Sequence, residues 1–245
     1  MKTWLFGLLW LGCWVPLQAV EQVLLFNYQQ KPPYIVDEAH RQGLYFDLAE
    51  RLNASLPAYH FVVREIPRKR LDYLLSRDQM HGLVVGVSPD WFADAARHRW
   101  TQAFIDDANL LVSRSAGEVS RLSASSLDGH RLGLVSGHRY PELKAVLRHG
   151  LVRREDAASE AANLERLMRG WIDATVVGVR TMEFHVQHQP ELRQQLFIAE
   201  PPLYRYRRHL LVPDGYAGLL PELNRVIAQL EQDPVWQTRL AHYRE

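Results

Sequence analysis

Four short stretches of the sequence place aromatic, hydroxyl or charged side chains beside glycine or proline, each directly after an apolar run. They are residues 28–34, 88–91, 136–140 and 178–180. Aromatic faces and polar side chains of this kind bind small polar molecules without covalent chemistry, and a ring face can also hold a cation. One such stretch alone is ordinary turn composition. Four of them at the same end of successive strands indicate a ligand site in a cleft.

Signals for reaction chemistry are weaker. His185 and His188 are three residues apart on a predicted helix, but a metal site needs further converging donors, so we interpret them as solvated side chains. Asp106 and Asp107 are adjacent on an extended segment, where neighbouring side chains point to opposite faces. The sequence contains no nucleophile elbow, phosphate-binding loop or dinucleotide fingerprint. We therefore expect no metal and no cofactor.

Composition narrows the class of protein. The chain has 245 residues, of which 47% are hydrophobic and 23% charged, as in ordinary globular proteins. Lys and Arg number 29 against 28 Asp and Glu, so there is no general basic field for nucleic acid or an anionic membrane surface. A single cysteine, Cys13, excludes an internal disulfide framework.

The first 19 residues are predicted to be a secretory signal peptide. Lys2 precedes an apolar run over residues 4–15, Pro16 ends that run, and Ala19 closes a suitable cleavage site. The run is about a dozen residues long, whereas a membrane span needs about 20. Leu-Gly-Cys at residues 11–13 offers lipidation on Cys13 as an alternative, although Trp10 stands where a lipoprotein signal usually has Leu. We expect cleavage and a periplasmic location.

The rest of the chain alternates between strand and helix patterns, which indicates a parallel sheet in an α/β fold. A polar connector over residues 115–126 divides it into two series. Apolar or alternating runs predict strands at residues 23–28, 59–66, 83–87, 105–113, 131–135, 151–154, 174–177, 195–199 and 209–212. Helices are expected at residues 45–56, 68–77, 141–147, 157–169, 181–187, 219–232 and 234–243. The basic run over residues 203–211 is interpreted as a solvated crossing strand, with Arg205 or Arg207 as alternative contacts for an anionic ligand.

Several segments, taken in order, resemble one family of proteins. They read NYQQKPPYIVDEAHRQGLYFDLAERL, RLDYLLSRDQMHGLVVGVS, SLDGHRLGLVSGHRYPEL, LERLMRGWIDATVVG and LPELNRVIAQLEQDPVWQTRLAHY. This order is similar to that of the bacterial periplasmic solute-binding proteins of family 3, the polar amino-acid class that serves ABC transporters.

The resemblance implies an α/β, two-lobed periplasmic-binding-protein-like fold of type II with two crossing hinge strands. The first lobe would comprise residues 20–112 and 206–245, and the second residues 113–205. It also implies a monomer that closes about its hinge on a small-molecule ligand and passes it to a membrane transporter permease or a sensor.

Two positions depart from the family pattern. Where amino-acid binders usually carry Thr-Pro-Glu-Arg, this chain has Ser88-Pro89-Asp90-Trp91, so the arginine that grips a ligand carboxylate is absent, with Arg97 or Arg99 as replacements. Where the family has an aspartate for the ligand's ammonium group, this chain has Gly178. These departures leave open an aromatic or larger ligand in place of a plain amino acid.

The expected ligand contacts come from both lobes. Those of the first lobe are Tyr28, Tyr34, Ser88 and Trp91, with Arg97 in reserve, and those of the second are His138, Arg139 and Tyr140. One alternative is an enzyme on the same fold, similar to the cyclohexadienyl dehydratases, with Glu183 and Asp90 as the acids to test. Another is an accessory sensory domain that has lost amino-acid binding.

Overall fold

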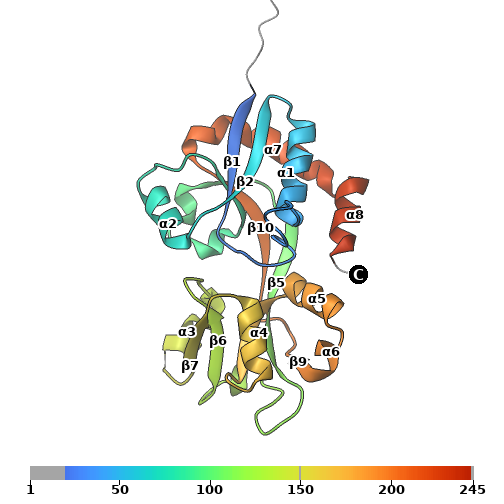
Figure 1. The fold of residues 1–245 in the computed structure, drawn as a ribbon. Coiled ribbons are helices and arrows are strands. Elements are labelled where there is room, and N and C mark those ends of the chain that lie inside the picture. Colours follow the sequence, from blue (N-terminus) through green and yellow to red (C-terminus); the bar gives the residue numbers. More distant parts are fainter. Residues whose placement is uncertain (1–19, 149, 244–245) are drawn as a thin grey trace, which may run out of the picture.

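The computed structural model describes residues 20–148 and 150–243. It consists of two α/β lobes, one above the other in Figure 1, with strands β5 (Ile105–Arg114) and β10 (Tyr204–Val212) running between them. The predicted signal peptide lies outside the described residues. In the part of the chain that is described, no helix combines the length and apolar character that crossing a membrane requires.

The first lobe contains both ends of the described chain. Strand β1 (Glu21–Asn27) lies between β2 (Tyr59–Glu65) and β3 (Leu83–Val87), parallel to both, and short β4 (Arg99–Trp100) pairs with β10. The helices are α1 (Leu44–Ser55), α2 (Arg68–Ser76), α7 (Leu220–Leu230) and α8 (Pro234–His242). The apolar face of α1 packs with α7, α8 and the sheet into the largest core cluster, because its leucines recur every four residues.

The second lobe repeats this plan with different lengths. Strand β6 (Arg131–Val135) lies between β7 (Arg153–Ala157) and β8 (Ala174–Gly178), parallel to both, and β9 (Leu196–Ile198) pairs with β5. The helices are α3 (Lys144–Arg148), α4 (Glu160–Met168), α5 (Val179–His188) and α6 (Leu192–Gln195). Ser159 caps α4 through its hydroxyl, which accepts a hydrogen bond from Ala162 N.

The two crossing strands join the sheets of the lobes. Residues 105–109 of β5 pair antiparallel with residues 204–208 of β10, after which residues 109–113 pair with β8. At its other end β10 pairs antiparallel with β3. The strands therefore follow one hydrogen-bonded order, β2-β1-β3-β10-β5-β8-β6-β7. The pairing within each lobe is parallel as predicted, whereas the crossing strands β5 and β10 pair antiparallel with each other and with their neighbours.

Most predicted elements lie within a few residues of the observed ones. The clearest differences are β10, which begins at Tyr204 and not at residue 209, and β7, which begins at Arg153. The basic run that opens β10 is a crossing strand, as interpreted from the sequence, and it extends the strand predicted at residues 209–212 toward its N-terminal side.

We predict that Gly86→Ala is strongly destabilising. Gly86 lies in β3 with φ of 73°, and an added Cβ would lie 1.7 Å from the Tyr45 hydroxyl oxygen. The variant combines left-handed backbone strain with a steric clash, so we expect a loss of about 3 kcal/mol or more in the free energy of unfolding. Urea unfolding measures it.

Gly137→Ala is the matched control. Gly137 has a similar φ of 76°, but a Cβ there would meet no atom within 4 Å. The free energy of unfolding of this variant should therefore fall by only about 1 kcal/mol. Equal losses in the two variants would contradict the close approach of Tyr45 to Gly86.

Candidate functional site

A small cavity lies between the lobes, where the sequence predicted a ligand cleft. Its volume is about 20 Å³, which is room for about one water molecule. The cavity is lined by side chains from both lobes and from the crossing strands. These residues are Tyr28, Gln29, Lys31, Trp91, Asn109, His138, Arg139, Tyr140, Glu160 and Tyr206. Small-molecule sites usually offer about 300–1,000 Å³. This cavity is therefore largely filled by the protein's own side chains.

One buried ion pair crosses this space. Lys31, on the loop between β1 and α1, places its Nζ 2.6 Å from Oε1 of Glu160, the first residue of α4. Both side chains are less than 10% exposed. The second carboxylate oxygen of Glu160 accepts a hydrogen bond of 3.0 Å from Gly178 N, so the pair also contacts the end of β8.

Gly178 leaves the room that this ion pair occupies. A Cβ added to Gly178 would lie 3.0 Å from Lys31 Nζ. The family has an aspartate at the position of Gly178, and this chain lacks that carboxylate. In the structure the carboxylate of Glu160 lies beside Gly178 instead. Sequence reasoning missed both Lys31 and Glu160, although a Glu directly after an N-cap serine is a visible signal for a carboxylate at the start of a helix.

A second buried ion pair joins the crossing strands. Arg208 of β10 and Asp107 of β5 are both fully buried, with Nη2 2.7 Å and Nε 2.9 Å from Asp107 Oδ2. Arg208 also donates to Gln29 Oε1 at 2.8 Å and to Gly86 O at 2.6 Å. The same Asp107 oxygen accepts hydrogen bonds from the Tyr34 hydroxyl at 2.5 Å and the Tyr206 hydroxyl at 2.9 Å.

Aromatic rings surround the Arg208 guanidinium. Its Cζ lies 4.0 Å from the ring centre of Tyr34, 5.5 Å from that of Trp91 and 5.3 Å from that of Tyr206. The aromatic residues thus hold a cation, but it is one that the chain itself supplies. The interpretation of this basic run as a solvated strand is wrong for Arg208, whereas Arg205 and Arg207 are exposed.

These contacts determine the charge state of the pair. Burial alone would raise the pKa of Asp107, but the positive charges of Arg208 and Lys31 and the hydrogen bond from Tyr34 hold the pKa below its ordinary value. Burial opposes the charge on Arg208, yet the neighbouring tyrosines and Asp107 hold its pKa well above the usual value. Asp107 is therefore a carboxylate and Arg208 a cation at neutral pH.

The second lobe contributes rings to the cavity. His138 lies edge-on to Tyr28 across the lobes, with ring centres 5.8 Å apart, and 6.5 Å from the ring of Tyr140. Burial and, to a smaller extent, the charge of Lys31 lower the pKa of His138 to about 4, although Glu160 acts in the opposite direction. His138 is therefore neutral at pH 7.

The structure brings together five of the eight predicted contacts. Tyr28, Trp91, His138, Arg139 and Tyr140 line the cavity, whereas three residues lie outside its lining. Tyr34 is fully buried under Asp107, and Ser88 is buried in the first lobe. Arg97 is exposed and lines a neighbouring pocket of about 160 Å³ with His98 and Asp94, and Arg139 lines both this pocket and the cavity.

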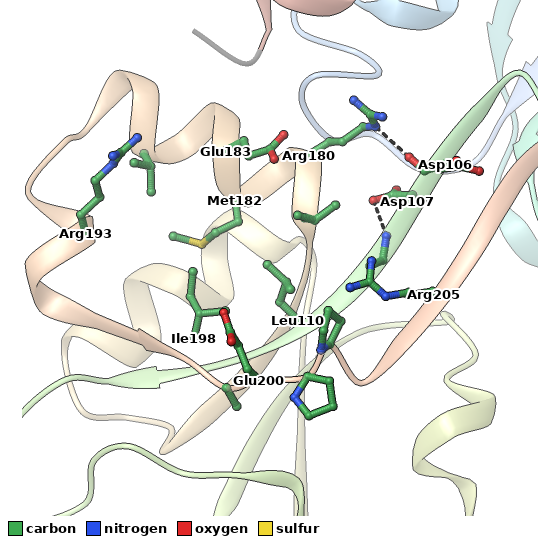
Figure 2. A pocket seen from close by; sticks show the side chains of 16 residues that line it. Asp106, Asp107, Leu110, Arg180, Met182, Glu183, Arg193, Ile198, Glu200 and Arg205 are labelled. Atoms are coloured by element: carbon green, nitrogen blue, oxygen red, sulfur yellow. Dashed lines mark hydrogen bonds between the residues drawn. The ribbon is translucent and has the colours of Figure 1, made fainter.

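A larger groove lies on the surface of the second lobe, beside the crossing strands (Figure 2). It has a volume of about 830 Å³ and an apolar centre formed by Leu110, Met182 and Ile198. Side chains of both charges surround this centre, among them Arg180, which donates from Nε to the Asp106 carbonyl. The groove opens widely to solvent and contains none of the eight predicted contacts, so its size alone does not make it the site.

The two acids considered for catalysis lie apart. Glu183 lines the groove, while Asp90 accepts a short hydrogen bond from the Tyr204 hydroxyl at the edge of the cleft. Among residues 20–148 and 150–243, no three His, Cys, Asp or Glu side chains converge as metal ligands.

Comparison with known proteins identifies the fold. No protein-family model matches the chain, and no curated protein is similar in sequence. An ancestral arginine-binding protein bound to arginine has a TM-score of 0.73 at 15% identity, covering 91% of this chain and 97% of that one. The GluR0 ligand-binding core from Nostoc punctiforme, in complex with L-glutamate, has a TM-score of 0.71 at 12% identity, with coverage of 91% and 98%.

A third solved structure is part of a longer protein. The periplasmic domain of BvgS from B. pertussis has a TM-score of 0.69 at 15% identity, and the match covers 91% of this chain but 43% of that one. These likenesses confirm the predicted two-lobed fold of periplasmic binding proteins.

We predict that Arg208→Met lowers the free energy of unfolding by about 3–5 kcal/mol, because it leaves Asp107 buried without its counter-charge. Protonation of Asp107 relieves that charge, so the difference from wild type should shrink near pH 4. Urea unfolding at pH 7 and pH 4 measures both effects.

Arg99→Gln is the control. It breaks an ion pair with Asp214 whose side chains are 51% and 82% exposed, so it should cost no more than about 1 kcal/mol. A similar loss in both variants would contradict the role of the buried pair.

We also predict a stability change in mild acid that depends on His138. Its pKa is about 4 in the folded protein against 6.5 for the free side chain, so the unfolded chain binds the proton first. Its contribution to stability is complete above pH 6.5 and is lost as the pH falls toward 4. Melting temperatures between pH 7 and pH 4 should fall less in His138→Gln than in wild type.

The melting temperature of His138→Gln should still fall somewhat between pH 7 and pH 4, for a known reason. Burial also lowers the pKa of His98, His185 and His209, which act in the same direction. An unchanged slope in His138→Gln would show that His138 is not held neutral by burial.

Proposed function

We propose that the protein is an exported solute-binding protein that holds a small polar solute between its two lobes. The observation that supports it most is the meeting of Lys31 of the first lobe and Glu160 of the second among the rings that line the cavity. If the lobes part, one cation and one carboxylate face each other across the cleft. This arrangement complements a solute that carries both charges, such as an amino acid or a related compound.

The comparisons support the same class. The similar structures include the substrate-binding protein of an amino-acid ABC transporter, with a TM-score of 0.70 at 15% identity. We therefore propose that the solute is delivered to a transporter permease or reported to a sensor. We propose residues 20–112 with 206–245 and residues 113–205 as the lobes, and a monomer as the working form.

The alternative functions receive different support. The two acids named for the enzyme alternative do not meet: Asp90 accepts a hydrogen bond from the Tyr204 hydroxyl, and Glu183 lies in the groove. The small cavity favours the second candidate, a sensory domain that no longer binds a solute. Ligand binding distinguishes this candidate from the first proposal.

We predict that a thermal-shift screen of amino acids, amines and organic acids finds a stabilising solute. At 100 times its Kd a ligand stabilises the protein by about 2.7 kcal/mol, which raises the melting temperature of a chain of this size by about 5–10 °C.

We also predict that the protein is exported and that its signal peptide is cleaved. Mass spectrometry of the protein purified from the periplasmic fraction should find an N-terminus at Val20. Lipid on Cys13 or a cytoplasmic full-length chain would contradict export.

Variants locate the solute once it is found. Trp91→Ala and Arg139→Ala should each weaken binding about tenfold or more by calorimetry, because both residues line the cavity. Trp171→Ala removes a tryptophan that is 56% exposed on the second lobe and should leave Kd unchanged. If Kd stays within about twofold in all three variants, the cleft is not the binding site.

A further inference from the structure

We propose that the solute carries a second carboxylate, and that this carboxylate binds in the pocket beside the cavity, to Arg139 of the second lobe and Arg97 of the first. This inference rests on the proposed function and narrows the solute to an acidic amino acid or a related dicarboxylic compound. The proposed function uses Lys31 and Glu160 for the two charges that every amino acid carries. It assigns nothing to the neighbouring pocket.

The pocket is placed so that one end of a solute can reach it. It has a volume of about 160 Å³ and lies next to the cavity, since Arg139 lines both. Arg139 belongs to the second lobe, whereas the other residues that line the pocket belong to the first. About 10–15 Å³ is enough for a water molecule, so this volume admits a carboxylate group. A solute between the lobes can therefore extend one end into the pocket.

Asp72, at the wall of the pocket, is shared by arginines from both lobes. Its Oδ1 lies 2.9 Å from Nε of Arg68, and its Oδ2 lies 3.8 Å from Nη2 of Arg139. Arg68 also donates to the Tyr28 hydroxyl at 3.0 Å and to the Trp91 carbonyl at 2.9 Å, so each of its three nitrogens has an acceptor. The contact of Arg139 is too long for a hydrogen bond. Its guanidinium donates no hydrogen bond to any residue that the structure describes, and it can donate to a ligand.

The charged side chains that line the pocket are those of Arg68, Arg97, Arg139, Asp72 and Asp94. Three cations thus face two carboxylates. His98 adds no charge at pH 7, because burial and, to a smaller extent, the charge of Arg97 lower its pKa. One carboxylate of the solute would balance the excess positive charge. A phosphate, with a charge of about −1.5 to −2, would exceed it.

Apolar side chains complete the pocket. Leu75 and Phe92 are buried in the first lobe and line it, and Cζ of Arg68 lies 4.7 Å from the centre of the Phe92 ring. Methylene groups can pack on such a wall while the charged end of the molecule contacts the arginines. This combination suits a solute whose second carboxylate is carried on a short methylene chain.

Calorimetry with two pairs of probes tests the proposal. L-glutamate is compared with L-glutamine, and L-2-aminoadipate with its side-chain amide, so that each pair differs in charge and hardly in shape. We expect at least one acid to bind wild type about tenfold or more tighter than its amide. Arg139→Gln and Arg97→Gln should each reduce this preference at least about threefold, because the amide makes no use of their charges. Asp94→Asn should increase the preference, because it removes a charge of the same sign as the ligand's carboxylate.

Arg99→Gln is the matched control. It removes the same charge two residues along the chain from Arg97, but Arg99 pairs with Asp214 and does not line the pocket. The preference for the acid should stay as in wild type. An equal reduction in Arg99→Gln and Arg97→Gln would overturn the proposal, because it would show an effect of overall charge and not of contact.

The remaining outcomes separate this proposal from the proposed function. If both amides bind as tightly as their acids, or if neither Arg139→Gln nor Arg97→Gln changes the preference, the pocket does not bind a carboxylate and the proposed function stands. The same holds if the thermal-shift screen finds a solute but neither acid binds. If no compound of the screen and no probe binds, the proposed function fails and this inference fails with it.

Discussion

The buried contact between Arg208 and Asp107 is the constraint on which the rest of the structure depends. This contact joins the two strands that pass between the lobes. Removing either charge would greatly lower the free energy of unfolding, because the other charge would remain buried without a partner. Everything around it satisfies these charges: the tyrosine hydroxyls, the amide of Gln29 and the backbone of Gly86. The left-handed backbone of Gly86 and the close approach of Tyr45 exist to complete this set.

A second charge pair governs the relation between the lobes. Lys31 lies near Asp107 as well as Glu160, so its cation lowers the pKa of Asp107 while it pairs with the other lobe. The two pairs thereby form one electrostatic unit, with one part in the hinge and the other across the cleft. Movement of the lobes changes the second pair and can leave the first intact.

The sequence predicts the fold well, because strands, helices and their order depend on local patterns of apolar residues. It predicts five of the cavity-lining residues, which lie in turns directly after strands. It misses the charged residues that matter most. Asp107 and Arg208 are 101 residues apart, and Lys31 and Glu160 are 129 apart. In the sequence each looks like an ordinary surface charge, since only the folded chain shows that its partner is buried beside it.

The second lobe is an insertion between two strands of the first, and this fixes an order of assembly. Strands β6 to β9 and their helices are complete once the chain has reached residue 198, whereas the first lobe still lacks β10, α7 and α8. The core of the first lobe therefore depends on contacts between distant parts of the sequence, and such contacts form slowly. The second lobe can fold as a unit while the first waits for the C-terminal segment. Arg208 can reach Asp107 only after the strands and helices of the second lobe have all been made.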